Sequence, residues 1–167
     1  APPASATPYS AQAMAERAMR VGIPAGVFNV VTGSARHIGN EITSNPLVRK
    51  LSFTGSTEIG RQLMQQCAKD IKKVSLELGG NAPFIVFDDA DIDSAIEGLV
   101  DAIWFNQGQV CCAGSRLLVQ EGIADRFHEK LKRRMDGLRI GDPLDKCIDV
   151  GAVVDPVQLA TITDMVN

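Results

Sequence analysis

The stretch Leu51-Ser52-Phe53-Thr54-Gly55-Ser56-Thr57-Glu58-Ile59-Gly60 indicates a strand that turns directly into a helix. Residues 48–53 are predicted to form the strand, and the helix is expected over residues 57–70. A helix N-terminus offers free backbone N–H groups and a positive dipole end, both of which suit a phosphate. Gly55 would let a ligand approach the backbone, and Ser56 could add a hydroxyl donor. An ordinary Gly-Ser turn explains the same residues, because the G-x-G-x-x-G spacing of the usual dinucleotide site is absent.

The remaining sequence alternates between helical and strand patterns, which predicts an α/β fold. Ahead of this stretch we expect a helix over Ser10–Arg20, a buried strand over Val27–Val31 and a short helix over 37–43. Beyond it, Asp91 is the expected cap of a helix whose apolar residues recur every three or four positions. The later elements are expected as strands over 74–78, 84–87 and 117–120 and as helices over 92–103, 123–137 and 156–166.

A new unit is expected to start just beyond Gly79-Gly80, where the third predicted strand ends. We therefore predict two partial domains, residues 1–80 and 81–167. The chain begins without Met, and its last predicted helix carries no stop signal. Both ends therefore look as if they were cut from a longer protein.

The composition excludes several classes of function. The chain has 167 residues, of which 45% are hydrophobic and 22% charged, with a net charge of −3. This balance is that of an ordinary globular protein and gives no basic surface for nucleic acid. The apolar runs are far shorter than a membrane span, and residues 1–10 lack the features of a signal peptide. We therefore expect neither a nucleic-acid partner nor a membrane partner.

The four cysteines are Cys67, Cys111, Cys112 and Cys147, and no two of them form a C-x-x-C pair. No metal site is therefore expected. Cys111 and Cys112 are poor disulfide partners because neighbouring side chains rarely reach the required torsion angle. A reducing, cytoplasmic compartment is the simplest expectation. Cys67 fits the core face of a helix, whereas Cys147 is expected in a loop.

Glu77 and Cys111 are the two residues that the sequence marks most clearly for chemistry. Glu77 lies near the end of an apolar strand, where it is either a surface residue or a partly buried acid suited to general-base catalysis. Cys111 lies between Gly108-Gln109 and Ala113-Gly114. These flanks favour a tight turn with backbone N–H groups free to hold an oxyanion. A lone cysteine is more often a small buried apolar residue, so the pattern alone leaves both roles open.

The three motifs, residues 53–60, 77–80 and 108–112, together resemble the NAD(P)-dependent aldehyde dehydrogenase superfamily in their order and spacing. The resemblance implies part of a Rossmann-like coenzyme-binding domain followed by the start of an α/β catalytic domain. It also implies a small aldehyde substrate and NAD or NADP as the cofactor. In this family the cysteine two residues after Gly-Gln is the nucleophile, which is Cys111 here, and the glutamate of Glu-Leu-Gly-Gly is the general base, which is Glu77.

The same resemblance implies a mechanism and a set of cofactor-binding residues. The Cys111 thiolate would attack the aldehyde carbonyl, hydride transfer to the nicotinamide would leave a thioester, and Glu77 would activate the water that hydrolyses it. The residues expected to bind the cofactor are Gly55, Ser56, Gly60, Leu78 and Ser5. Ser5 stands where NAD-preferring members often carry glutamate, and it would tolerate the 2′-phosphate of NADP.

Within the family, two parts of the chain resemble different branches. Residues 44–91 resemble succinate-semialdehyde dehydrogenases, which makes succinate semialdehyde the expected substrate. Residues 111–116 look like broad-specificity aldehyde dehydrogenases instead. The resemblance further implies that the parent enzyme is a homo-oligomer.

Two other interpretations remain open. Because the resemblance covers only part of a family member, the isolated chain is expected to show weak activity or none. It would then be a catalytically inactive nucleotide-binding or interaction module. A cysteine-based acyl-transfer enzyme would need a histidine base, and neither His37 nor His128 has a companion residue that suggests one.

Overall fold

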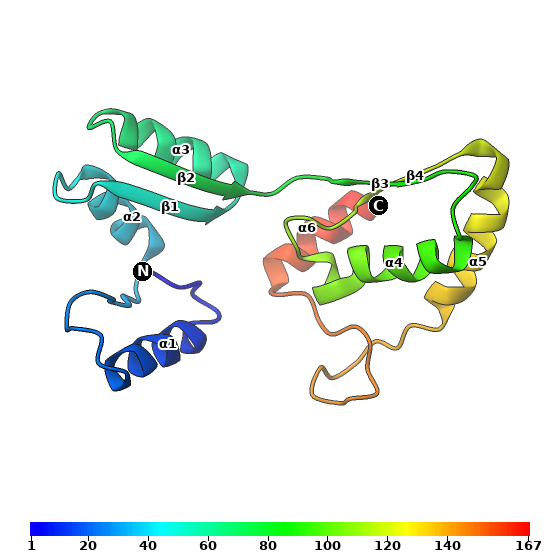
Figure 1. Cartoon of the computed structure of the whole chain (residues 1–167), viewed down its shortest axis with the longest axis horizontal. Coiled ribbons are helices and arrows are strands. Elements are labelled where there is room, and N and C mark those ends of the chain that lie inside the picture. Colours follow the sequence, from blue (N-terminus) through cyan, green and yellow to red (C-terminus); the bar gives the residue numbers. More distant parts are fainter. The chain divides into compact units, whose positions relative to one another are not determined.

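The structure is a computed structural model that describes all residues, 1–167. It divides into two compact units, residues 1–78 and residues 79–167 (Figure 1). Each unit contains two parallel strands joined by a helix, so the predicted α/β fold is confirmed. None of the helices combines the length and the apolar character that a membrane span requires.

The first unit is built on a parallel pair of strands. Its elements are α1 (Tyr9–Arg20), α2 (Ala35–Ser44), β1 (Lys50–Gly55), α3 (Thr57–Ala68) and β2 (Lys73–Leu78). The pairing of β1 with β2 runs from Lys50 opposite Lys73 to Gly55 opposite Leu78. Parallel strands cannot be joined by a tight hairpin, so α3 provides the crossover. The strand and helix predicted on either side of Gly55 are thus present.

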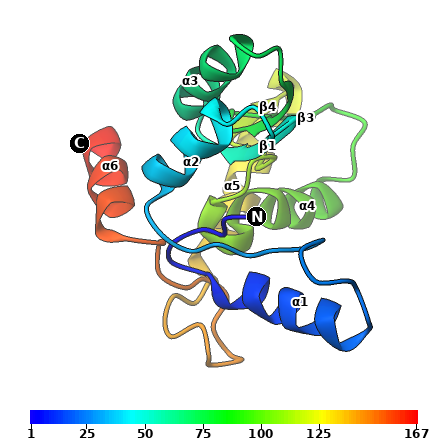
Figure 2. The same ribbon diagram turned by 90° about the vertical axis from the view of Figure 1, so that its left-hand side faces the viewer.

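Helices α2 and α3 form one layer on this pair of strands. α3 contacts both strands, and α2 lies against α3 (Figure 2). Leu51 from β1 and Cys67 from α3 are buried, whereas the alternate residues of both strands are exposed. The strands therefore bury one face against the helices and leave the other face bare in this unit.

The strand predicted over Val27–Val31 does not form. These residues have no strand geometry, and the side chains of Val27 and Val31 are 70% and 50% exposed. Their only long-range backbone hydrogen bonds are with Ala1. Val31 N donates to Ala1 O, and the Ala1 amino group donates to Asn29 O. A strand needs a neighbour that continues its hydrogen-bond ladder, and β1 and β2 pair only with each other. The prediction of a buried strand was wrong for this reason.

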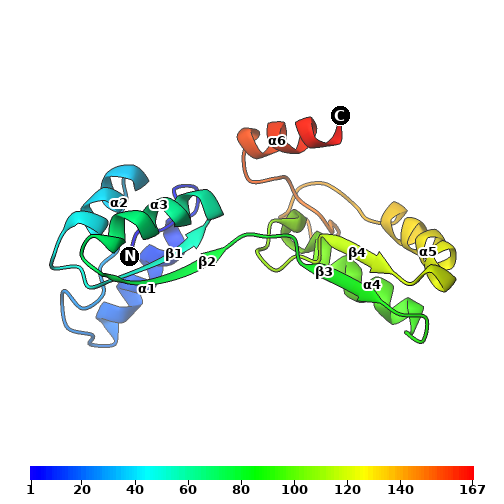
Figure 3. The same cartoon turned by 90° about the horizontal axis from the view of Figure 1, so that it is seen from above.

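The second unit repeats the strand–helix–strand plan. Its elements are β3 (Pro83–Val86), α4 (Ile92–Trp104), the short 3₁₀ helix η1 (Phe105–Gly108), β4 (Arg116–Val119), the 3₁₀ turn η2 (Glu121–Ile123), α5 (Ala124–Asp136) and α6 (Pro156–Val166). β3 and β4 are parallel, with Pro83 opposite Arg116 and Val86 opposite Val119. α6 stands apart from α4 and α5 (Figure 3), and none of its residues is buried.

The core of the second unit lies between its strands and the helices α4 and α5. Asp91 caps α4, as predicted, by accepting a hydrogen bond from Ser94 N at 2.8 Å. This bond from the Ser94 backbone N–H lowers the pKa of Asp91. The apolar stripe of α4 faces inward and packs against one face of β3 and β4 and against α5. The buried members of this core are Val86, Ile92, Ile96, Leu99, Val100, Phe127 and Leu131.

Replacing Phe127 with alanine is expected to destabilise the second unit by about 3–5 kcal/mol, since it would leave a large cavity. The Phe127 side chain is 1% exposed and is among the largest buried side chains. Phe87→Ala is the matched control, because Phe87 is 62% exposed, and we expect it to cost less than about 1 kcal/mol. Urea unfolding curves would measure both changes, and equal losses of stability would contradict this description of the core.

Candidate functional site

The first candidate region is the N-terminus of α3. Ser56 is the cap of this helix, and its Oγ accepts a hydrogen bond from Ile59 N at 3.3 Å. The N–H groups of Thr57 and Glu58 lie in the first turn, where a helix supplies no internal acceptor. Both residues and Ser56 are exposed. This end of α3 therefore presents the donors that a phosphate requires, although the Glu58 carboxylate occupies the same turn.

The two glycines of this motif have structural roles that the sequence did not show. A Cβ at Gly55 would lie 2.5 Å from Cζ of Phe53, so the Phe53 ring occupies the space that was expected for a ligand. A Cβ at Gly60 would lie 2.6 Å from Cδ2 of Leu78. Gly60 is buried, and its missing side chain lets α3 pack closely on β2. Leu78, also a predicted cofactor residue, is thus a packing partner of Gly60.

Glu77 lies on β2 opposite Thr54 of β1. Its neighbours Leu76 and Leu78 are half-buried, whereas Glu77 itself is exposed. It belongs to the face of the strand pair that α2 and α3 leave uncovered. The sequence left open whether this carboxylate is a surface residue or a partly buried acid, and the structure shows it at the surface.

Ser5 lies in a turn of the N-terminal segment, closed by the hydrogen bond from Thr7 N to Ala4 O at 3.2 Å. It is exposed, and no hydrogen bond joins it to the α3 N-terminus. The structure therefore brings together four of the predicted cofactor residues, and Ser5 stands separately. The four residues are Gly55, Ser56, Gly60 and Leu78.

The second candidate region is the loop that carries Cys111. Residues Val110 to Ala113 form a turn in which Ala113 N donates to Val110 O at 3.0 Å. Cys111 and Cys112 occupy the two central positions, and both are exposed free thiols. The predicted turn at Cys111 is confirmed. An exposed thiol on a turn is accessible to an electrophile, unlike a thiol packed in a core.

The donors that could hold an oxyanion differ from those expected. The N–H of Ala113 is used by Val110 O, and the N–H of Gly114 donates to Ala102 O at 3.1 Å. Both groups are therefore already bonded. The N–H groups of Cys111 and Cys112 make no hydrogen bond within the chain and remain available.

Backbone geometry before Cys111 was not predicted. Asn106, Gln107 and Gly108 are consecutive residues with positive φ angles of 49°, 58° and 74°. Asparagine and glycine adopt this conformation more readily than other residues, so Asn106 and Gly108 were a weak signal for it. Gln107 carried no such signal.

The two remaining cysteines lie where the sequence predicted. Cys67 is fully buried in α3, and burial raises the pKa of its thiol. Cys147 is exposed in a loop, where its N–H donates to Asp145 Oδ1 at 2.8 Å. Burial disfavours the thiolate at Cys67, so this cysteine is unsuited to nucleophilic chemistry.

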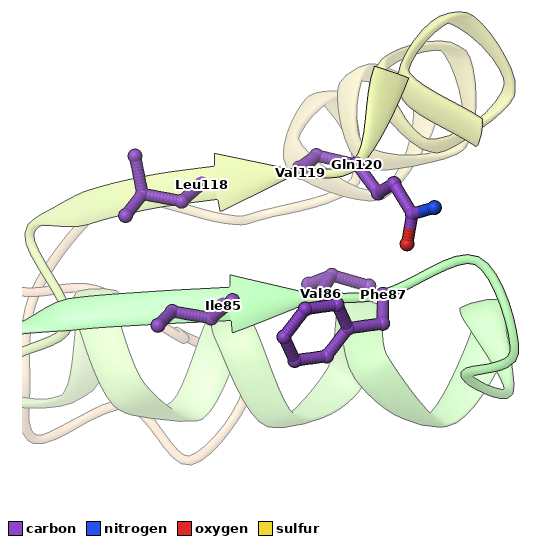
Figure 4. Close-up of a pocket in the computed structure, with 6 residues that line it drawn as sticks. All are labelled: Ile85, Val86, Phe87, Leu118, Val119 and Gln120. Atoms are coloured by element: carbon purple, nitrogen blue, oxygen red, sulfur yellow. The ribbon is translucent and has the colours of Figure 1, made fainter. Parts of the chain in front are cut away.

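A shallow hollow in the second unit lies away from Cys111. It runs over the outer face of β3 and β4 and is lined by Ile85, Val86, Phe87, Leu118, Val119 and Gln120 (Figure 4). α4 lies behind the strands in this view. The hollow is mostly apolar and contains none of the predicted site residues.

Comparison with known proteins identifies the family. The sequence model of the Aldehyde dehydrogenase family matches residues 1–167. The chain belongs to the aldehyde dehydrogenase family. The resemblance that the three motifs carry is thus confirmed.

Several relatives in the aldehyde dehydrogenase family are highly similar to this chain. It is 64% identical over 162 residues to the succinate-semialdehyde dehydrogenase (NADP(+)) GabD of Escherichia coli strain K12, covering 97% of this chain and 34% of that protein. It is 59% identical over 162 residues to a glutarate-semialdehyde dehydrogenase of Pseudomonas aeruginosa, with 97% and 34% covered. The chain therefore spans about a third of the length of these relatives.

A solved structure shows that the fold is also that of an aldehyde dehydrogenase. The NAD-dependent aldehyde dehydrogenase from Sinorhizobium meliloti matches with a TM-score of 0.97 and 41% sequence identity. The match covers 99% of this chain and 33% of that one. The predicted similarity to succinate-semialdehyde dehydrogenases is confirmed by the named relative from E. coli.

Proposed function

We propose that the whole protein oxidises an aldehyde to its carboxylic acid with NAD or NADP, through a thioester on Cys111. The observation that carries this proposal is an exposed free thiol on a hydrogen-bonded turn, in a chain that belongs to the aldehyde dehydrogenase family. We assign residues 1–80 to part of the coenzyme-binding domain and residues 81–167 to part of the catalytic domain. The four free cysteines fit a reducing compartment, and we propose the cytoplasm.

Cys111 is the proposed nucleophile. Its thiolate attacks the aldehyde carbon, and the negative charge moves to the carbonyl oxygen. The unpaired N–H groups of Cys111 and Cys112 are the backbone donors that could stabilise this oxygen. Covalent attachment to sulfur divides the oxidation into an acylation step and a hydrolysis step, each with a lower barrier.

Glu77 is the proposed general base of the hydrolysis step. Its carboxylate is exposed on β2 and forms no ion pair, so it is free to accept a proton from water. When Glu77 removes a proton from water, the resulting hydroxide attacks the thioester. This attack releases the carboxylic acid and restores the Cys111 thiol.

The N-terminus of α3 is the proposed site for the phosphates of the coenzyme. The N–H groups of its first turn and the Ser56 hydroxyl provide the donors, while Gly60 keeps α3 close to β2 and Leu78. Ser5 and Gly55 are assigned to the same coenzyme by resemblance. When bound, NAD or NADP would supply the hydride acceptor.

The proposed substrate is an aldehyde that carries a carboxylate, with succinate semialdehyde as the first choice. The relatives named for succinate semialdehyde and glutarate semialdehyde support this class. Turnover of both semialdehydes by the whole protein, with NAD and with NADP, tests the proposal. Coenzyme binding without turnover of either aldehyde would favour the alternative of an inactive nucleotide-binding module.

Replacing Ser56 with alanine is expected to weaken coenzyme binding by about three- to tenfold, because one hydroxyl donor and one helix cap are lost. Ser34→Ala is the matched control, since Ser34 caps α2 in the same way, with its Oγ accepting from His37 N. Both variants lose a cap, but only Ser56→Ala should change coenzyme affinity in a fluorescence titration. Equal affinities for the two variants would argue against a phosphate site at α3.

A further inference from the structure

The backbone just ahead of Cys111 forms a left-handed turn. α4 ends at Trp104, and Asn106, Gln107 and Gly108 then have φ angles of 49°, 58° and 74°. Gln107 carries a side chain that disfavours such an angle, whereas asparagine and glycine tolerate it better. Consecutive residues of this kind persist only where the surrounding structure holds them, and they concentrate at functional sites.

Two glutamines attach this turn to a distant segment, residues 151–154. Gln109 Oε1 accepts a hydrogen bond from Val154 N at 3.1 Å. With its nitrogen facing Asn106 and its oxygen facing Gly151, the Gln107 amide accepts a hydrogen bond from Gly151 N at 3.0 Å. Both glutamines are half-buried. Asp155 follows directly and caps α6, so the segment that donates these bonds leads into a helix.

The turn is also bonded within itself. Gln109 N donates to Asn106 O at 3.0 Å, and Asn106 Nδ2 donates to Gln109 O at 3.3 Å. Gln109 is therefore held at its backbone by Asn106 and at its side chain by Val154. It lies two residues before Cys111, so its side-chain bond acts close to the thiol.

The chain after Cys111 is fixed independently. Ala113 and Gly114 are buried, and Gly114 N donates to Ala102 O at 3.1 Å. A Cβ at Gly114 would lie 3.2 Å from Cβ of Phe84, so this end of the loop is tightly packed. Cys111 thus lies on an exposed turn between two anchored ends, and Gln109 provides the anchor on the α4 side.

We infer that Gln109 is a positioning residue, whose hydrogen bond from Val154 N holds the Cys111 turn in the geometry needed for attack on the aldehyde. This inference rests on the proposed role of Cys111 as the nucleophile. No hydrogen bond joins Gln109 to Cys111, so in this role Gln109 acts through the backbone of the turn. Reactions of bound groups depend steeply on such placement, because a displacement of about 1 Å can lower the rate by about 100-fold.

The test compares Gln109→Met with Gln109→Glu in the whole protein. Methionine has a similar length but provides no oxygen for Val154 N, whereas glutamate keeps an acceptor at the same position. We expect Gln109→Met to lower kcat by about tenfold or more, with KM changed less than about threefold. Gln109→Glu is expected to retain a kcat within about threefold of that of the unmodified protein. Hydrogen–deuterium exchange in the peptide containing Val154 should become faster in Gln109→Met and stay slow in Gln109→Glu.

Gln120→Met is the matched control. Gln120 Oε1 accepts a similar hydrogen bond from Asp88 N at 2.9 Å, and its Nε2 also donates to Asp88 Oδ2 at 2.8 Å, just beyond β4 and outside the Cys111 loop. This variant loses both bonds and should still keep its kcat. Should Gln109→Met fail to fold, Gln109→Asn replaces it, because its shorter side chain keeps the amide but cannot reach Val154.

Normal kcat in Gln109→Met, or equal losses in Gln109→Met and Gln109→Glu, would overturn the positioning role. A failure of the proposed function gives a different result. If Cys111→Ser were as active as the unmodified protein, Cys111 would not be the nucleophile, whereas the exchange measurement would still report whether Gln109 holds Val154.

Discussion

Aldehyde oxidation by the whole protein is expected to fall by at least about 10³-fold when Cys111 is replaced by serine. A serine hydroxyl is a much weaker nucleophile than a thiolate at neutral pH. The measurement is the steady-state rate of reduced coenzyme formation. Coenzyme affinity should change little in the same variant, because Cys111 is not among the residues proposed to bind the coenzyme.

Cys112→Ser is the control for this prediction. Cys112 is also an exposed free thiol, and it occupies the second central position of the turn, directly after Cys111. We expect this variant to retain activity within a few-fold. Iodoacetamide should also label Cys111 faster than Cys147, while Cys67 should react slowest because burial raises the pKa of its thiol. Loss of activity in Cys112→Ser but not in Cys111→Ser would reverse the assignment.

The second large effect is expected from Glu77→Gln. An amide cannot accept the proton of the attacking water, so kcat should fall by about 10²- to 10⁴-fold. Attack by Cys111 and the first oxidation do not need this base. A rapid-mixing experiment should therefore show a burst of reduced coenzyme equal to the enzyme concentration, followed by slow turnover.

Glu121→Gln serves as the matched control for Glu77→Gln, because Glu121 is also an exposed carboxylate and lies in the short turn η2. It should behave like the unmodified protein. A Glu77→Gln variant that lost the burst would indicate a role before the thioester, and one with normal kcat would remove Glu77 from the mechanism.

Much of the local structure was predictable from the sequence. The cap Asp91 and the apolar stripe of α4 appear where they were predicted, and α3 begins at Thr57 as expected. These features depend on contacts between residues three or four positions apart, which sequence spacing shows directly. The first helix was nearly correct, but it begins at Tyr9 after Pro8 instead of being capped by Ser10. Small shifts of this kind are typical of helix ends.

The motifs and the periodicity of the sequence were enough to predict the family, the α/β order of the elements and the candidate residues Glu77 and Cys111. The folded structure was needed to show that residues 27–31 are not a strand and that the Phe53 ring fills the space beside Gly55. It was also needed to show that Gln109 bonds to Val154, which lies 45 residues further along the chain. Periodicity and helix caps arise from residues close together in the sequence, so the sequence shows them. The pairing of strands, the position of the Phe53 ring and the bond to Val154 depend on partners that become adjacent only in the folded chain.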